Sequence, residues 1–177
     1  MDFDFRGDPV LSAALEYWRR KRGARTMPAR RDIDPIDMPA EILPYLQIIE
    51  VLEDGRRFRY RLIGTALVEA FGSDYSGTYP EEVLSPARAD FIEQVYRRVH
   101  ETKRPLFSRN KYVMQDNPSA LMANRVYLPL SNDEVTVNFI LGALSFDYRY
   151  FNRLHGAWGG AVLDDSVQYT HEIHIDD

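Results

Sequence analysis

The chain has 177 residues, of which 45% are hydrophobic, and 22 lysines and arginines stand against 27 aspartates and glutamates, for a net charge of −5 at pH 7. This length is enough to bury one core, so a single domain with arms is expected. The negative net charge argues against general binding to nucleic acid or to an anionic membrane, because phosphate groups need a positive field. The lack of cysteine excludes disulfides, thiolate metal sites and a cysteine nucleophile.

The apolar runs and the first residues bear on the cellular location of the protein. The longest apolar run, residues 137–144, is far shorter than the ~20 residues that a membrane helix needs. The opening sequence MDFDFRGDP is acidic where a signal peptide would be basic. We therefore expect a cytoplasmic protein with no membrane insertion.

The first predicted element is an amphipathic helix between Asp8 and Gly23. Asp8 can cap the free N–H groups of a first turn, and Gly23 is a typical helix end. Leu11, Leu15 and Trp18 recur at helical spacing and form one apolar stripe. Because such a stripe has to cover a surface, we expect this helix to pack on its own sheet or to form the contact of a homodimer.

An extended arm and a β-hairpin are predicted next. Residues 24–37 contain two prolines and few apolar side chains, which is typical of an extended segment. Two β-rich runs, residues 45–52 and 57–63, surround an Asp-Gly turn and predict a hairpin. Alternation along the second run places three side chains toward the core: Phe58, Tyr60 and Leu62.

The remaining pattern is helical and then β-like. Two short helical segments precede a longer helix over residues 86–102, and three β-like runs follow it at 106–114, 124–130 and 137–148. Short turns between neighbouring strands favour an antiparallel sheet, and helices grouped between strand pairs favour an α+β fold.

The region around Arg61 is a candidate structural or binding motif. Arg61 ends the second hairpin strand next to the predicted helices, so we expect it to be partly covered and to need a carboxylate or an anionic ligand. Gly64 is expected to adopt a positive φ or to approach a neighbour closely. Thr65 is placed to cap the following helix. The candidate carboxylates are Glu69, Asp74 and Asp90.

The sequence carries no motif of a common enzyme class. It has no P-loop, no HExxH, no glycine-rich dinucleotide motif and no nucleophile elbow. His171 and His174 could chelate a metal only from a helical tail, and a solvated chain end is the simpler interpretation. We therefore predict no catalytic residue and no metal site, and we expect that the protein is not an enzyme.

Three stretches together resemble the PAS-domain family, and in particular its small stand-alone bacterial PAS-like members. They are LEYWRRKRGARTMPARRDIDPIDMPAEILPYL, FRYRLIGTALVEAFGSDYSG and RVYLPLSNDEVTVNFILGAL, and the resemblance spans roughly residues 11–150. It implies a five-stranded antiparallel sheet with helices on one face, in addition to the N-terminal helix. The expected division is an N-terminal helix and arm at 1–37, a PAS-like domain at 38–150 and an aromatic, acidic tail at 151–177.

The resemblance also implies a function. PAS domains hold a small ligand or cofactor between the sheet and the helices, or fill that space with side chains, and they often dimerise through flanking helices. We expect a non-enzymatic sensory module with an unknown ligand, an unknown cofactor and output through a homodimer or a signalling partner. An enzyme on a similar curved fold and a filled-core interaction protein remain the alternatives. The candidate pocket residues are Tyr60, Arg61, Phe71, Phe91, Val95, Tyr112, Arg125 and Tyr127.

Overall fold

The computed structural model describes residues 7–114, 117–146 and 161–173, and it gives only the backbone course of 112–114, 117–121 and 161–169. Its elements, in chain order, are α1 (Pro9–Arg22), β1 (Leu46–Leu52), β2 (Arg57–Ile63), α2 (Thr65–Phe71), α3 (Pro80–Val83), α4 (Pro86–Thr102), β3 (Leu106–Met114), β4 (Asn117–Leu130), β5 (Phe139–Phe146) and β6 (Ala161–Glu172).

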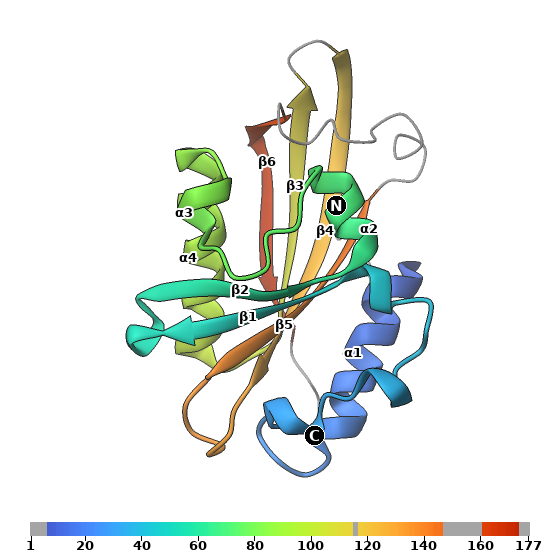
Figure 1. The fold of residues 1–177 in the computed structure, drawn as a ribbon, viewed down its shortest axis with the longest axis vertical. Coiled ribbons are helices and arrows are strands. Elements are labelled where there is room, and N and C mark those ends of the chain that lie inside the picture. The colour runs from blue at the N-terminus through green and yellow to red at the C-terminus, as the bar shows by residue number, and fades with distance from the viewer. Residues whose placement is uncertain (1–6, 115–116, 147–160, 174–177) are drawn as a thin grey trace.

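The strands form one twisted antiparallel sheet in the order β2-β1-β5-β4-β3-β6 (Figure 1). The predicted α+β class is confirmed, with a sixth strand added to the five expected. The addition is β6, which pairs with β3 at the edge of the sheet and lies in the segment that we expected to be a tail. Residues 161–172 show no clean alternation in sequence, so neighbouring strand β3, rather than local pattern, determines their conformation.

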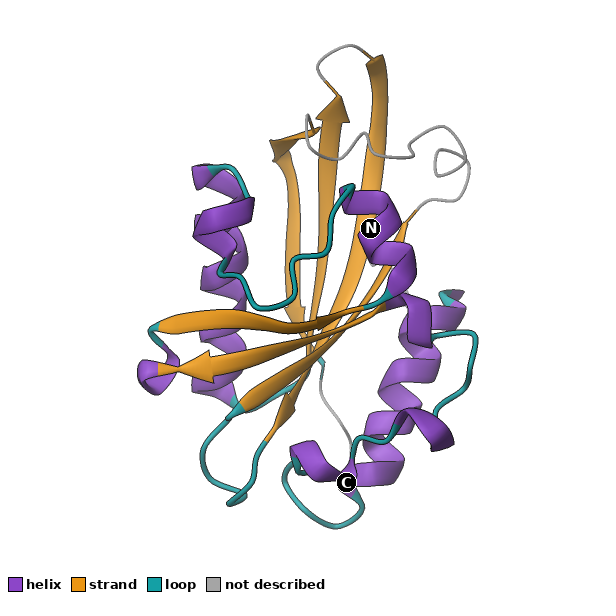
Figure 2. Cartoon of the chain, viewed as in Figure 1, coloured by secondary structure: helices purple, strands orange, loops and turns teal. Residues whose placement is uncertain are grey.

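Helices cover both faces of the sheet (Figure 2). Leu144 of β5 faces α4, because it lines a cavity together with Ile92 of that helix. The next residue, Ser145, points the opposite way and donates a hydrogen bond to Asp8 at the start of α1. We call the α4 side the inner face and the α1 side the outer face.

Helix α1 begins and ends as the sequence predicts. The Asp8 carboxylate accepts hydrogen bonds from the N–H groups of Val10 and Leu11, at 3.1 and 3.2 Å, and Gly23 ends the helix at φ +58°.

The apolar stripe of α1 packs on the outer face of its own sheet. Leu11, Leu15 and Trp18 are 0%, 5% and 1% exposed, and Trp18 Nε1 donates to the Pro129 carbonyl at 2.8 Å. Of the two expected packing modes, the intramolecular one is therefore observed. This corrects the assignment of the stripe to a dimer contact, because side chains buried within one chain offer no surface to a second copy.

Residues 24–37 are not a free extended arm. Two 3-10 turns, Arg30–Asp32 and Pro35–Asp37, interrupt them, and Met27 and Ile33 are buried in the core. The Ser131 N–H also donates to the Pro28 carbonyl at 2.9 Å, which fixes the arm to the loop after β4. The sequence pattern missed this docking because only single apolar residues of the arm make it.

The β1–β2 hairpin forms as predicted, but a bulge changes its last residues. Ile49 pairs with Tyr60 and Ile48 pairs with Leu62, which leaves Arg61 as an extra residue of β2. A bulge of this kind reverses the alternation beyond it. Phe58 and Tyr60 are buried as expected, whereas Leu62 is 41% exposed and the prediction of its inward position was wrong.

Gly64 lies where the chain passes from β2 to α2, and its role is close packing. Its φ is −66°, so no positive φ is involved, and a Cβ built there would lie 2.3 Å from the Pro44 carbonyl oxygen. The Gly64 N–H donates to the Leu46 carbonyl at 2.7 Å. Gly64 itself occupies the N-cap position, so Thr65 is the exposed first residue of α2 and its predicted capping role was wrong.

Candidate functional site

A small cavity lies between the inner face and α4, where the sequence predicted a ligand site. Its volume is about 30 Å³, enough for one or two water molecules, whereas small-molecule pockets usually measure about 300–1,000 Å³. Four of the eight predicted residues line it: Tyr60, Phe71, Arg125 and Tyr127.

Aromatic rings fill most of the space around this cavity. Tyr96 of α4 meets Tyr127 edge-on at 5.3 Å between ring centroids, and it meets Phe58 at 5.4 Å. Phe71 of α2 stacks on Tyr75 at 5.2 Å. Burial raises the pKa of the Tyr96 phenol well above its ordinary value, so the ring remains neutral and packs as an apolar group with one polar atom.

Polar side chains reach the same space from the sheet. Arg125 is 3% exposed, and its Nη1 donates to Asn110 Oδ1 at 2.8 Å. Ser108 Oγ donates to the same oxygen at 2.9 Å. Gln47 lines the cavity at 3% exposure and packs over Gly142, where a Cβ would lie 2.8 Å from Gln47 Cγ. The inner face thus presents a guanidinium and two amides within an aromatic environment.

Sequence reasoning missed Gln47 and Asn110. The signal was a polar residue at an inward-facing position of a strand: Asn110 shares its side of β3 with Leu106 and Ser108. Burying a polar side chain at such a position costs free energy unless it is hydrogen-bonded. A polar residue there therefore indicates a buried polar network.

The other predicted pocket residues lie apart from the cavity. Val95 is buried and Phe91 is half-buried on α4, but neither lines it. The side chain of Tyr112 lies outside the described part of the structure.

Arg61 is not covered, contrary to our expectation. Its side chain is 51% exposed, and Nε lies 3.9 Å from Glu50 Oε2 rather than next to Glu69, Asp74 or Asp90. Alternation places Arg61 on the side opposite to Tyr60, and the position of β2 at the sheet edge leaves that side chain open to solvent. Glu50 is bound more closely by Arg59, at 2.6 Å.

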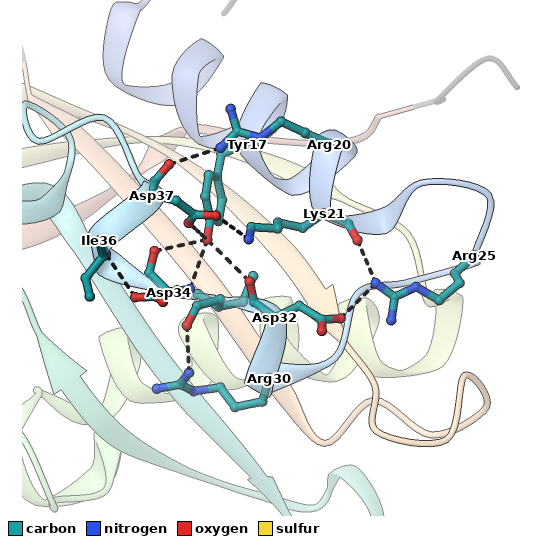
Figure 3. Close-up of polar contacts among 10 residues, drawn as sticks. Tyr17, Arg20, Lys21, Arg25, Arg30, Asp32, Asp34, Ile36 and Asp37 are labelled. Carbon is teal, nitrogen blue, oxygen red and sulfur yellow. Dashed lines mark hydrogen bonds and ion pairs between the residues drawn. The ribbon is translucent and has the colours of Figure 1, made fainter.

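A second polar cluster joins α1 to the arm (Figure 3). The Tyr17 hydroxyl donates to Asp37 Oδ1 at 2.8 Å and accepts from the Asp34 N–H at 2.9 Å. Lys21 forms an ion pair with Asp37 and, with the Tyr17 hydrogen bond, holds the pKa of that carboxyl below its ordinary value. The polar groups of this cluster bind one another, so we assign the cluster a structural role.

The Arg30, Asp32 and Pro35 positions of the first family-like stretch fall within this part of the arm. Asp32 accepts from the Ala29 N–H at 2.9 Å and pairs with Arg25 at 2.7 Å, and both contacts lower its pKa, the backbone bond more strongly. Pro35 opens the 3-10 turn that Asp34 caps. The motif therefore folds the arm back onto α1.

Within the described ranges, no three histidines, aspartates or glutamates are grouped as a metal site would require. In the same ranges, no helix has the length and apolar character needed to cross a membrane.

Comparison with known proteins identifies the family of the chain. A family model described as PAS domain matches residues 7–145. The chain belongs to the PAS-domain family, as its sequence motifs predicted. A similar solved structure is the PAS domain of BvgS from Bordetella pertussis, which is 17% identical, with 64% of this chain and 88% of that chain covered at a TM-score of 0.47. No curated protein matches the chain.

Proposed function

We propose that this protein is a non-enzymatic sensory module that binds a small ligand between the inner face and α4. Membership of the PAS family supports a sensory or signalling role. The observation that carries the ligand proposal is the buried Arg125, which reaches an aromatic cavity together with Gln47. Burying such groups costs free energy, and a few polar groups among aromatic rings are typical of ligand sites.

Ligand binding requires this cavity to enlarge. Its cover is formed by Phe71 at the end of α2 and by Tyr75 in the following loop, both of them half-buried. Two hydrogen bonds tie this loop to β2, from the Tyr60 N–H to the Thr78 carbonyl at 2.9 Å and from the Gly77 N–H to the Tyr60 carbonyl at 2.7 Å. We propose that the cover moves outward with the ligand, and that this movement is relayed to a partner protein or a second copy.

A filled-core interaction module is the second candidate. The specific observation in its favour is the cavity volume of about 30 Å³, which excludes an organic ligand unless side chains rearrange. The two candidates differ in whether the inner face ever holds a molecule.

Native mass spectrometry of freshly purified protein separates the two, with two matched substitutions as controls. Leu144→Phe adds bulk at the cavity, whereas Leu128→Phe adds the same bulk on the outer face, since Leu128 follows the cavity residue Tyr127 along β4. Each substitution overpacks a buried position and costs about 1–3 kcal/mol.

The proposal predicts a native mass above the denatured mass, retained by Leu128→Phe and lost from Leu144→Phe. The spectra also report whether the protein is a dimer. Equal native and denatured masses in the parent, with unchanged partner binding in Leu144→Phe, would favour the filled-core module.

A further inference from the structure

A cleft much larger than the inner cavity lies elsewhere in the described structure. It has a volume of about 660 Å³, within the usual range of small-molecule pockets. Its walls are the end of α1, residues 23–26, the turn from α4 to β3 and the residue after β6. We call it the basic cleft, because its charged lining residues are Arg22, Arg25, Lys103 and Arg104.

The described carboxylates and helix ends neutralise only part of this charge. Arg25 pairs with Asp32 at 2.7 Å, while Arg104 lies 3.8 Å from Glu172, which Arg98 contacts more closely at 2.9 Å. The C-termini of α1 and α4 also lie here, and each contributes about half a negative charge. Against four cations, Asp32 and the two helix ends leave about two positive charges in the cleft.

Arg22 and Lys103 supply most of the unmatched charge. Neither forms an ion pair with a carboxylate among the described residues, and Arg22 Nε is buried there without a hydrogen-bond partner. The Arg22 guanidinium lies 5.9 Å from the centre of the Trp18 ring. This distance is within the range of a cation–π contact, which leaves guanidinium N–H groups able to bind an oxyanion.

The other walls are apolar. Trp18, Pro105 and Ile173 lie behind the cleft, but they are buried, with Trp18 only 1% and Ile173 6% exposed. The surface that a ligand can reach is therefore formed mainly by the basic side chains.

We propose that the basic cleft binds a phosphate or pyrophosphate group, held by Arg22 and Lys103. A guanidinium and an ammonium group lining the same cleft are donors of the kind that bind phosphate oxygens. The site is separate from the inner cavity, so this inference does not depend on the ligand proposed there.

Isothermal titration calorimetry of the full chain at low ionic strength tests the proposal, because salt screens such contacts. The probes are ADP, inorganic pyrophosphate and adenosine. The variants are Arg22→Gln and Lys103→Gln, and the matched control is Arg31→Gln, which removes the same charge from an exposed arginine of the arm outside the cleft.

We expect ADP and pyrophosphate to bind and adenosine not to bind, because the phosphate groups supply the contacts. Arg22→Gln and Lys103→Gln should each weaken ADP binding about tenfold or more, since a charge-assisted hydrogen bond is lost. Arg31→Gln should change it less than twofold. Circular dichroism confirms that each variant is folded.

Three results would overturn the proposal. The first is the absence of ADP and pyrophosphate binding. The second is an equal loss of affinity in Arg31→Gln, which would indicate general charge attraction only. The third is binding that appears only after removal of residues 174–177, which would make the cleft a site for the chain's own acidic end rather than for a phosphate.

Discussion

The two faces of the sheet are covered by helices in different ways. On the outer face, α1 packs an apolar stripe against β4 and β5, and Trp18 adds one buried hydrogen bond to the sheet backbone. On the inner face, α4 packs Tyr96 against strands that also bury Arg125 and Asn110. The outer contact is what hydrophobic burial alone would favour. The inner contact includes a buried charge, which favours function over stability as the reason for its presence.

The largest expected effect comes from Trp18, on the outer face. Trp18→Ala removes a side chain that is 1% exposed and should lower the free energy of unfolding by about 3–5 kcal/mol. Trp18→Phe keeps most of the apolar volume but leaves the Pro129 carbonyl without its donor, at a cost of about 1–3 kcal/mol. Urea denaturation of the two variants measures both numbers. A loss below 1 kcal/mol in Trp18→Ala would show that α1 is not docked as described.

The inner face should respond differently, because its polar groups depend on one another. Arg125→Met leaves Asn110 Oδ1 without the guanidinium donor and should cost about 1–3 kcal/mol. Asn110→Leu removes the acceptor, and the double variant should be less destabilised than the sum of the single variants by about 0.5–3 kcal/mol. Urea denaturation of the parent, the two single variants and the double variant gives the coupling free energy of the pair. Additive losses would mean that the pair contributes nothing as a unit.

A smaller effect is expected from acid, through the cluster that holds the arm to α1. Lys21, and then Tyr17, hold the pKa of Asp37 below its ordinary value of 3.8, so the folded state favours the charged carboxylate. This contribution is present above the ordinary pKa and is lost as the pH falls through the lowered one. The effect is small because the carboxylate is accessible to solvent.

Asp37→Asn checks this assignment, since it keeps an acceptor for Tyr17 but removes the charge that faces Lys21. Melting temperatures measured from about pH 6 to about pH 2 should show the parent more stable at the upper end, with the difference vanishing at the lower end. A constant difference across this range would mean that the ion pair contributes nothing.

Local chemistry explains which parts of the fold could be predicted. The limits of α1 follow from Asp8 and Gly23, and the hairpin follows from its Asp-Gly turn, because each signal acts within a few residues. The strand at 161–172 could not be predicted, since its conformation depends on pairing with β3 some fifty residues earlier. The docking of the arm is equally non-local.

The candidate site was predictable to a similar extent. Tyr60 and Tyr127 follow from strand alternation and line the cavity as expected. Arg61 does not line it, because alternation along β2 places Arg61 on the side of Arg59, where both side chains approach Glu50. Trp18 and Arg22 were recognised only as parts of a helix, since the cleft beside them is assembled from three distant segments.

The smallest effect is expected at Arg61, an exposed residue of the edge strand β2. Arg61→Ala should change the free energy of unfolding by less than about 0.5 kcal/mol, because the side chain is 51% exposed and 3.9 Å from its carboxylate. Arg59→Ala is the matched comparison two residues away and should cost more, since Arg59 binds Glu50 through both Nε and Nη2, at 3.0 and 2.6 Å. Urea denaturation of both variants tests the order. If Arg61→Ala lost as much stability as Trp18→Phe, Arg61 would have to be buried, and its exposed position on the edge strand would be wrong.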